Sequence, residues 1–242
     1  MTAYIKIFLL VLITPILLTE AIAQDSTEAD IIFTPIKHAT FVIHTPTITI
    51  YVDPVGDSKA FKKFPPPDFI LITDIHRDHL ELEVVNSLKQ EKTVIVGPQA
   101  VVARLKYGEI LNNGEKKSFS TMNLEAIPMY NQTKERLKFH KKGRGNGYVI
   151  TVNKKRIYIS GDTEDVKEMR SLKDIDYAFV CMNLPYTMSV EQAASAVLEF
   201  KPKVVFPYHY KGTDGFSDVE RFKHLVSKNK EIEVRLLDWY NK

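Results

Sequence analysis

The segment "FILITDIHRDHLE", residues 69–81, places two aspartates and two histidines within six positions directly after an apolar run. The apolar residues predict a short buried strand, and the apolar spacing in "LELEVVNSLKQ" predicts a helix after it. Side chains at the carboxyl end of such a strand lie where open α/β folds usually bind ligands. Asp74, His76, Asp78 and His79 therefore predict a metal site, although Asp78 as a helix cap beside two surface histidines is the alternative.

Two later segments repeat this arrangement of an apolar strand that ends in an aspartate or a histidine. In "RIYISGDTE" the strand ends at Gly161, which permits a tight turn before Asp162 and Thr163. In "KVVFPYHYKG" an apolar run ends at His209. Each segment alone is explained by a turn or by a buried histidine with a hydrogen-bond partner. Together with residues 69–81 they predict one shared cluster of ligands.

The rest of the chain predicts a single domain over residues 24–242 that mixes strands and helices. Paired strands open it, and "GYVITVNKKRIYISGD" predicts a hairpin that turns at Asn153 and Lys154. In the last third, strands alternate with helices, as in "DYAFVCM" followed by "SVEQAASAVLEF". Two polar stretches, "GDSKAFKKFPPPD" and "NQTKERLKFHKKGRGNG", predict solvated loops beside the site.

The first residues have the pattern of a secretory signal peptide over residues 1–23. Lys6 precedes an apolar run from Ile7 to Leu18, and small residues lead to a cleavage point after Ala23. The run is shorter than the roughly 20 residues that span a membrane. An exported chain, periplasmic or secreted and without a stable membrane anchor, is therefore expected. An uncleaved N-terminal anchor is the alternative.

Charge and cysteine content narrow the class of partner. The chain has 33 basic and 30 acidic side chains spread along it, so no basic patch predicts nucleic-acid binding. Its only cysteine, Cys181, cannot form an internal disulfide, so the core must provide the stability. A small-molecule substrate is expected, while the sequence leaves the oligomeric state open.

The order "DIHRDH", "SGDT" and "PYHY" resembles the metallo-β-lactamase superfamily, whose signature is H-x-H-x-D-H followed by G-D-T and a late histidine. "FHKKGRGNGYVI" is also similar to the branch often compared with ascorbate-phosphate lactonases. The resemblance implies a four-layer αββα sandwich, which agrees with the alternation of strands and helices. It covers most of residues 24–242.

The resemblance also implies a centre with two metal ions. It places His76 in the first metal site and gives Asp162 the role of the carboxylate that bridges both ions. The second site then consists of Asp78, His79 and His209.

The first metal site departs from the family pattern, because Asp74 stands where the family has its first histidine. A carboxylate oxygen can still bind zinc, and it shifts the preference towards manganese or iron. His140 is the candidate that completes this site, and Asn131 is the alternative. His38, Asn131 and Thr163 are expected to contact the ligands from behind.

The chemistry implied is metal-assisted hydrolysis with two divalent ions, zinc first and Mn²⁺ or Fe²⁺ as alternatives. A metal-activated hydroxide would attack an ester, lactone, amide or phosphoester, with Asp78 orienting the water or accepting its proton. Two other functions stay open. One is a secreted metal-binding domain without catalysis, and the other is a metal-dependent phosphodiesterase or nuclease.

Overall fold

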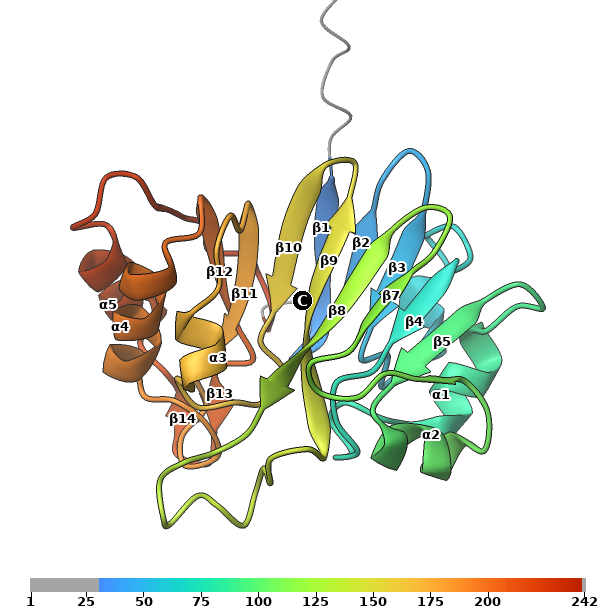
Figure 1. The fold of residues 1–242 in the computed structure, drawn as a ribbon, viewed down its shortest axis with the longest axis horizontal. Helices are drawn as coiled ribbons and strands as arrows, with labels where there is room; N and C mark the ends of the chain where they lie inside the picture. The colour runs from blue at the N-terminus through green and yellow to red at the C-terminus, as the bar shows by residue number, and fades with distance from the viewer. Residues whose placement is uncertain (1–30, 241–242) are drawn as a thin grey trace, which may run out of the picture.

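The computed structural model describes residues 31–240 as two β-sheets that lie face to face between two layers of helices (Figure 1). This is the four-layer αββα sandwich that the sequence predicts. The predicted signal peptide, residues 1–23, lies outside the described residues. Within the part of the chain that is described, no helix is both long and apolar enough to cross a membrane.

The first sheet has six strands, which follow one another across the sheet in chain order. Its first three strands pair antiparallel and the later ones pair parallel. Two α-helices and a 3-10 turn connect its strands. The strands are β1 (Ile32–Lys37), β2 (Thr40–His44), β3 (Thr49–Val52), β4 (Phe69–Leu71), β5 (Val94–Gly97) and β6 (Glu109–Ile110); the helical elements are η1 (Ser58–Phe61), α1 (Leu82–Leu88) and α2 (Gln99–Leu105).

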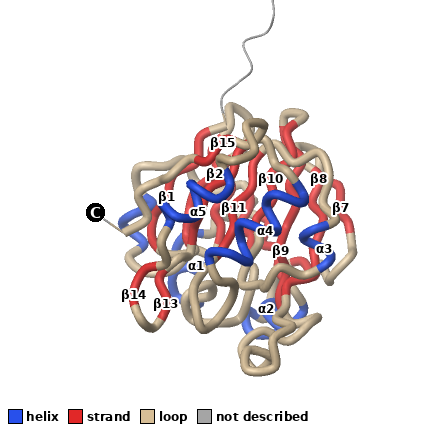
Figure 2. The backbone as a smooth tube through the Cα atoms, turned by 90° about the vertical axis from the view of Figure 1, so that its left-hand side faces the viewer, coloured by secondary structure: helices blue, strands red, loops and turns tan. Residues whose placement is uncertain are grey.

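The second sheet has seven strands, and its helices cover the outer face in Figure 2. Across the sheet the order is β15 (Glu233–Val234), β12 (Val204–Tyr208), β11 (Tyr177–Cys181), β10 (Lys155–Ile159), β9 (Gly145–Val152), β8 (Asn123–Met129) and β7 (Lys116–Ser118). The helices are α3 (Lys167–Arg170), α4 (Val190–Phe200) and α5 (Val219–Val226), and β13 (Lys211–Gly212) and β14 (Gly215–Phe216) form a separate hairpin.

The alternation of side chains along the strands produces two apolar cores. In β2, Phe41 and Ile43 face the second sheet, while Val42 between them packs with the residues of α1 and α2. Phe179 of β11 stacks on Phe41 across the sheets, with ring centroids 4.4 Å apart, and on Phe206 in its own sheet at 4.8 Å. Both faces of the first sheet are therefore buried, which explains its nearly continuous apolar strands.

Most predicted elements are present. The hairpin between β9 and β10 turns at Asn153 and Lys154, whose φ values of 48° and 61° suit a tight turn. Most of residues 56–68 are exposed, as the predicted solvated loop requires, but η1 forms there and Phe61 is buried against Tyr51. A single aromatic side chain in a polar stretch gives too weak a periodic signal to predict this contact.

The fold brings distant strand ends to one edge. The turn after β4 carries residues 72–80, Asp162 follows β10, and His209 follows β12 directly. β10, β11 and β12 run parallel, so their carboxyl ends lie at the same edge of the second sheet. The connection between β8 and β9, residues 130–144, also reaches this edge.

Candidate metal centre

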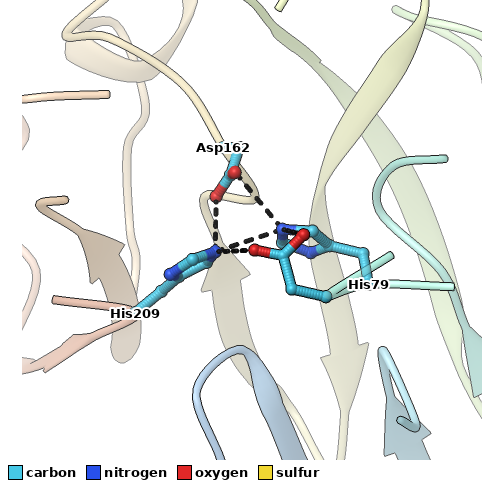
Figure 3. A group of neighbouring side chains, drawn as sticks. His79, Asp162 and His209 are labelled. Atoms are coloured by element: carbon cyan, nitrogen blue, oxygen red, sulfur yellow. Dashed lines mark hydrogen bonds and ion pairs between the residues drawn. The ribbon is translucent and has the colours of Figure 1, made fainter. Parts of the chain in front are cut away.

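Four of the predicted ligands form one compact cluster (Figure 3). The Nε2 atoms of His79 and His209 lie 3.2 Å apart. Asp162 approaches both rings, with Oδ2 at 3.3 Å from Nε2 of His79 and Oδ1 at 3.1 Å from Nε2 of His209. Asp78 closes the group with Oδ2 at 3.4 Å from Nε2 of His209. Two imidazole nitrogens and two carboxylates thus converge on one point.

A second cluster contains the other three predicted ligands, Asp74, His76 and His140. Nδ1 of His76 lies 2.8 Å from Oδ2 of Asp74. Nε2 of His140 lies 3.2 Å from Oδ2 of Asp162, the same oxygen that approaches His79. Asp162 therefore lies between the two clusters, in the place that the bridging role requires.

The local backbone explains how these side chains reach the edge. Gly161 has φ 60°, and its left-handed conformation turns the chain after β10 so that Asp162 leaves the sheet. His209 has φ 45°, which is uncommon for a residue with a Cβ atom. Such conformations persist where the surroundings enforce them, and they cluster at functional sites.

Burial and charge act against each other in the four-residue cluster. Burial would raise the pKa of Asp162, but the imidazoles of His209 and His79 outweigh it and hold that pKa well below its ordinary range. Burial would lower the pKa of His79, but the carboxylates of Asp162, Asp53 and Asp78 raise it well above 6.5. In the metal-free protein a protonated imidazole thus balances the negative charge of the carboxylates. A divalent cation can supply the same positive charge.

Asp53 belongs to the site although the sequence reasoning missed it. Its Oδ2 lies 2.8 Å from Nδ1 of His79, and it accepts hydrogen bonds from both the backbone N–H and the hydroxyl of Thr73. A carboxylate at Nδ1 keeps a proton there and leaves Nε2 free to bind a metal. A signal for it exists in the sequence, because Asp53 follows β3 just as Asp74 follows the apolar run of β4.

Asn183 contacts the other histidine from behind and was also not predicted. Its Nδ2 lies 3.2 Å from Nδ1 of His209, and its Oδ1 accepts a hydrogen bond from the hydroxyl of Thr187. Nothing in the sequence marks it, since it lies in the irregular segment between β11 and α4. Its role depends on the tertiary structure.

His38 and Thr163, which were expected behind the ligands, make different contacts. Nε2 of His38 lies 3.4 Å from Oδ2 of Asp78, and Nδ1 lies 2.8 Å from the hydroxyl of Tyr240. The hydroxyl of Thr163 is within hydrogen-bond distance of two backbone carbonyl oxygens, so it supports the turn after β10. Asp78 does not cap α1, because the N-cap residue is Glu81.

The structure distinguishes between His140 and Asn131 as the residue that completes the first metal site. Nε2 of His140 faces Asp162, whereas Asn131 lies behind the ring, with Nδ2 3.3 Å from Nδ1 of His140. Asn131 also donates from Nδ2 to the carbonyl oxygens of Tyr186 and Arg136. His140 is therefore the residue that presents a ligand atom to the cluster.

A cavity of about 350 Å³ opens onto both clusters. Phe139 and Tyr186 form one wall with their rings edge to face at 5.0 Å. None of residues 56–68 lines this cavity, so the prediction that this loop borders the site is wrong. A larger depression of about 640 Å³ beside β5 contains none of the predicted ligands. The lining residues of the site cavity are His76, Asp78, Phe139, His140, Asp162, Asn183 and Tyr186.

The donor set of the four-residue cluster fits a divalent metal. Oδ1 of Asp162 is buried and makes no well-aligned hydrogen bond among the described residues. Its contact is the ion pair with Nε2 of His209 at 3.1 Å, and a bound cation would satisfy the oxygen further. Imidazole nitrogens and carboxylate oxygens suit zinc, iron and manganese. The cavity beside Asp78 leaves room for a water molecule and a substrate. An αββα sandwich with such a centre at its sheet edge is the arrangement expected of a metal-dependent hydrolase.

Comparison with known proteins agrees with this class. The family described as Beta-lactamase superfamily domain matches residues 28–209, and the chain belongs to this metallo-β-lactamase superfamily. It is 29% identical over 223 residues to a UPF0173 metal-dependent hydrolase of Ligilactobacillus salivarius, an alignment that covers 82% of this chain and 94% of the relative.

Two solved structures share the fold. A candidate metal-dependent hydrolase from Parabacteroides distasonis is 40% identical, with a TM-score of 0.79 over 86% of this chain and 93% of the other. A metallo hydrolase from Ignicoccus hospitalis is 22% identical, with a TM-score of 0.73 over 86% and 94%. The second likeness concerns the fold alone.

Proposed function

We propose that the protein is an exported hydrolase that uses a metal-activated hydroxide on a small ester, lactone, amide or phosphoester. The observation that carries this proposal is the convergence of two Nε2 atoms with a buried carboxylate oxygen that makes no well-aligned hydrogen bond, at the floor of a cavity. A divalent ion bound there would lower the pKa of a coordinated water to about 7 and so supply hydroxide at neutral pH.

The chain's own residues divide the remaining tasks. His79, His209 and Asp162 are buried, so they would hold the ion in a fixed position. Asp78 is 43% exposed and lines the cavity, so its carboxylate is placed to orient a water molecule or to accept its proton. Phe139 and Tyr186 provide apolar surface for the uncharged part of a substrate.

The metal we propose is zinc, because imidazoles and carboxylates in these numbers suit it, with Mn²⁺ or Fe²⁺ as alternatives. Export is proposed from residues 1–23 alone, and the size of the cavity favours a small molecule. The resemblance of "FHKKGRGNGYVI" to the lactonase-like branch makes lactones the first substrates to test.

The test compares the protein as purified, after chelation, and after addition of zinc or manganese, on a panel of esters, lactones, amides and phosphodiesters. We expect hydrolysis of one class to disappear on chelation and to return with metal. Asp162→Asn and His209→Ala should lower kcat/KM at least about 100-fold, or about 2.7 kcal/mol. His224→Ala, at an exposed histidine on α5, is the matched control and should leave the activity unchanged.

Activity that persists after complete removal of metal would refute the proposal. A tightly bound ion without turnover on the whole panel would instead support the metal-binding domain as the function. Turnover confined to phosphodiesters would support a phosphodiesterase or nuclease.

A further inference from the structure

Arg144 is the residue just before β9, and its side chain reaches into the cluster of Asp74, His76 and His140. Its guanidinium pairs with Asp74 through two parallel hydrogen bonds, from Nε to Oδ1 at 3.1 Å and from Nη2 to Oδ2 at 2.9 Å. Nη2 also lies 3.3 Å from Nε2 of His76 and donates to the carbonyl oxygen of Phe139 at 2.5 Å. The guanidinium thus contacts two of the three predicted ligands of the first site.

These contacts occupy side-chain atoms that a metal ion would need as ligands. Both carboxylate oxygens of Asp74 accept from Arg144. His76 has Nδ1 against Asp74 and Nε2 against Nη2 of Arg144, so both ring nitrogens are occupied. The four-residue cluster differs in this respect, since no arginine or lysine contacts its ligand atoms among the hydrogen bonds and ion pairs of the described residues.

Charge and burial favour the arginine over a second ion. The side chain of Asp74 is fully buried, and removing one partner of a buried ion pair is strongly destabilising. A guanidinium stays charged and fits a carboxylate with two bonds at once. Bound to the same carboxylate, a divalent ion would face a fixed like charge, which weakens its binding.

We propose that Arg144 takes the place of the second metal ion, so that the wild-type protein binds one ion per chain, at Asp78, His79, Asp162 and His209. The guanidinium then supplies the positive charge at the His76 end of the cavity, where it can stabilise negative charge that develops on a substrate oxygen. This inference rests on the proposed function in assuming that the centre binds a metal at all. It revises the expectation of two ions.

The test measures metal content rather than turnover. Metal-free wild-type protein is dialysed against zinc and its zinc content is determined by elemental analysis, and binding is followed in parallel by titration with cobalt, whose visible absorption reports each bound ion. We expect one equivalent in the wild type and two in Arg144→Met, where Asp74 and His76 become free. Arg144→Lys keeps a cation in the cluster and should remain at one.

The outcomes separate this inference from the proposed function. Two equivalents of similar affinity in the wild type would overturn the inference and leave the function standing. Zero equivalents would overturn the function itself. Circular dichroism and thermal unfolding establish that the variants are folded, and one equivalent in a folded Arg144→Met would show that the arginine does not exclude the second ion. The wild-type result needs no variant and decides the stoichiometry alone.

Discussion

Replacement of Asp53 by asparagine should weaken metal binding although Asp53 is not itself a predicted ligand. The carboxylate holds a proton on Nδ1 of His79, 2.8 Å away, and leaves Nε2 directed at Asp162. In Asp53→Asn one oxygen can still accept from the backbone of Thr73, but the amide NH₂ then faces His79. The ring is driven to carry its proton on Nε2, the nitrogen that must bind the metal.

The size of the effect follows from the hydrogen bond that this substitution removes. A hydrogen bond to a charged group contributes about 1.5–3 kcal/mol. Loss of a residue that orients a metal ligand typically costs about 10–100-fold in affinity, which is about 1.4–2.7 kcal/mol. The two ranges agree, so we expect the dissociation constant for zinc to rise about 10–100-fold in Asp53→Asn.

The assay is a competition titration of metal-free protein against a fluorescent zinc chelator at pH 7.5. Asp176→Asn is the matched control, because Asp176 is also buried and accepts a backbone N–H, from Arg156 at 2.8 Å. It precedes β11, so it lies at the end of the strand opposite to the site. Equal zinc affinities for wild type and Asp53→Asn would refute the reasoning about the tautomer, and an equal loss in Asp176→Asn would point to a general effect on folding.

The remaining predictions concern pH and packing. Because carboxylates raise the pKa of His79 above 6.5 despite its burial, its contribution to the stability of the metal-free protein is complete below about pH 6.5 and is lost as pH rises through the raised pKa. Without metal, the melting temperature of the wild type should therefore fall more between about pH 6.5 and 9 than that of His79→Gln, and parallel melting curves against pH would contradict this. Zinc affinity should rise over the same pH range, because the ion displaces the proton from His79. Phe179→Ala should lower the free energy of unfolding in urea by about 3–5 kcal/mol, since its ring stacks on Phe41 and Phe206 in the main core. A decrease below about 1 kcal/mol would contradict the packing described.

The sequence predicts a helix or turn correctly where a single segment carries the whole pattern. The helix predicted in "SVEQAASAVLEF" is α4, Val190–Phe200, and the turn predicted at Asn153 and Lys154 is where the hairpin reverses. Short elements such as α3 and β6 were missed because two to four residues give no detectable period.

The sequence by itself determined the types of ligand and the strand ends that carry them, because the alternation of apolar runs and polar turns is a local property of the chain. It could not show that Asp53 supports His79 or that Arg144 pairs with Asp74 across 70 positions of sequence. Those contacts form only when two sheets are packed together and their loops meet at one edge. The choice between His140 and Asn131 was decided in the same way, by which side chain the folded loop turns towards Asp162.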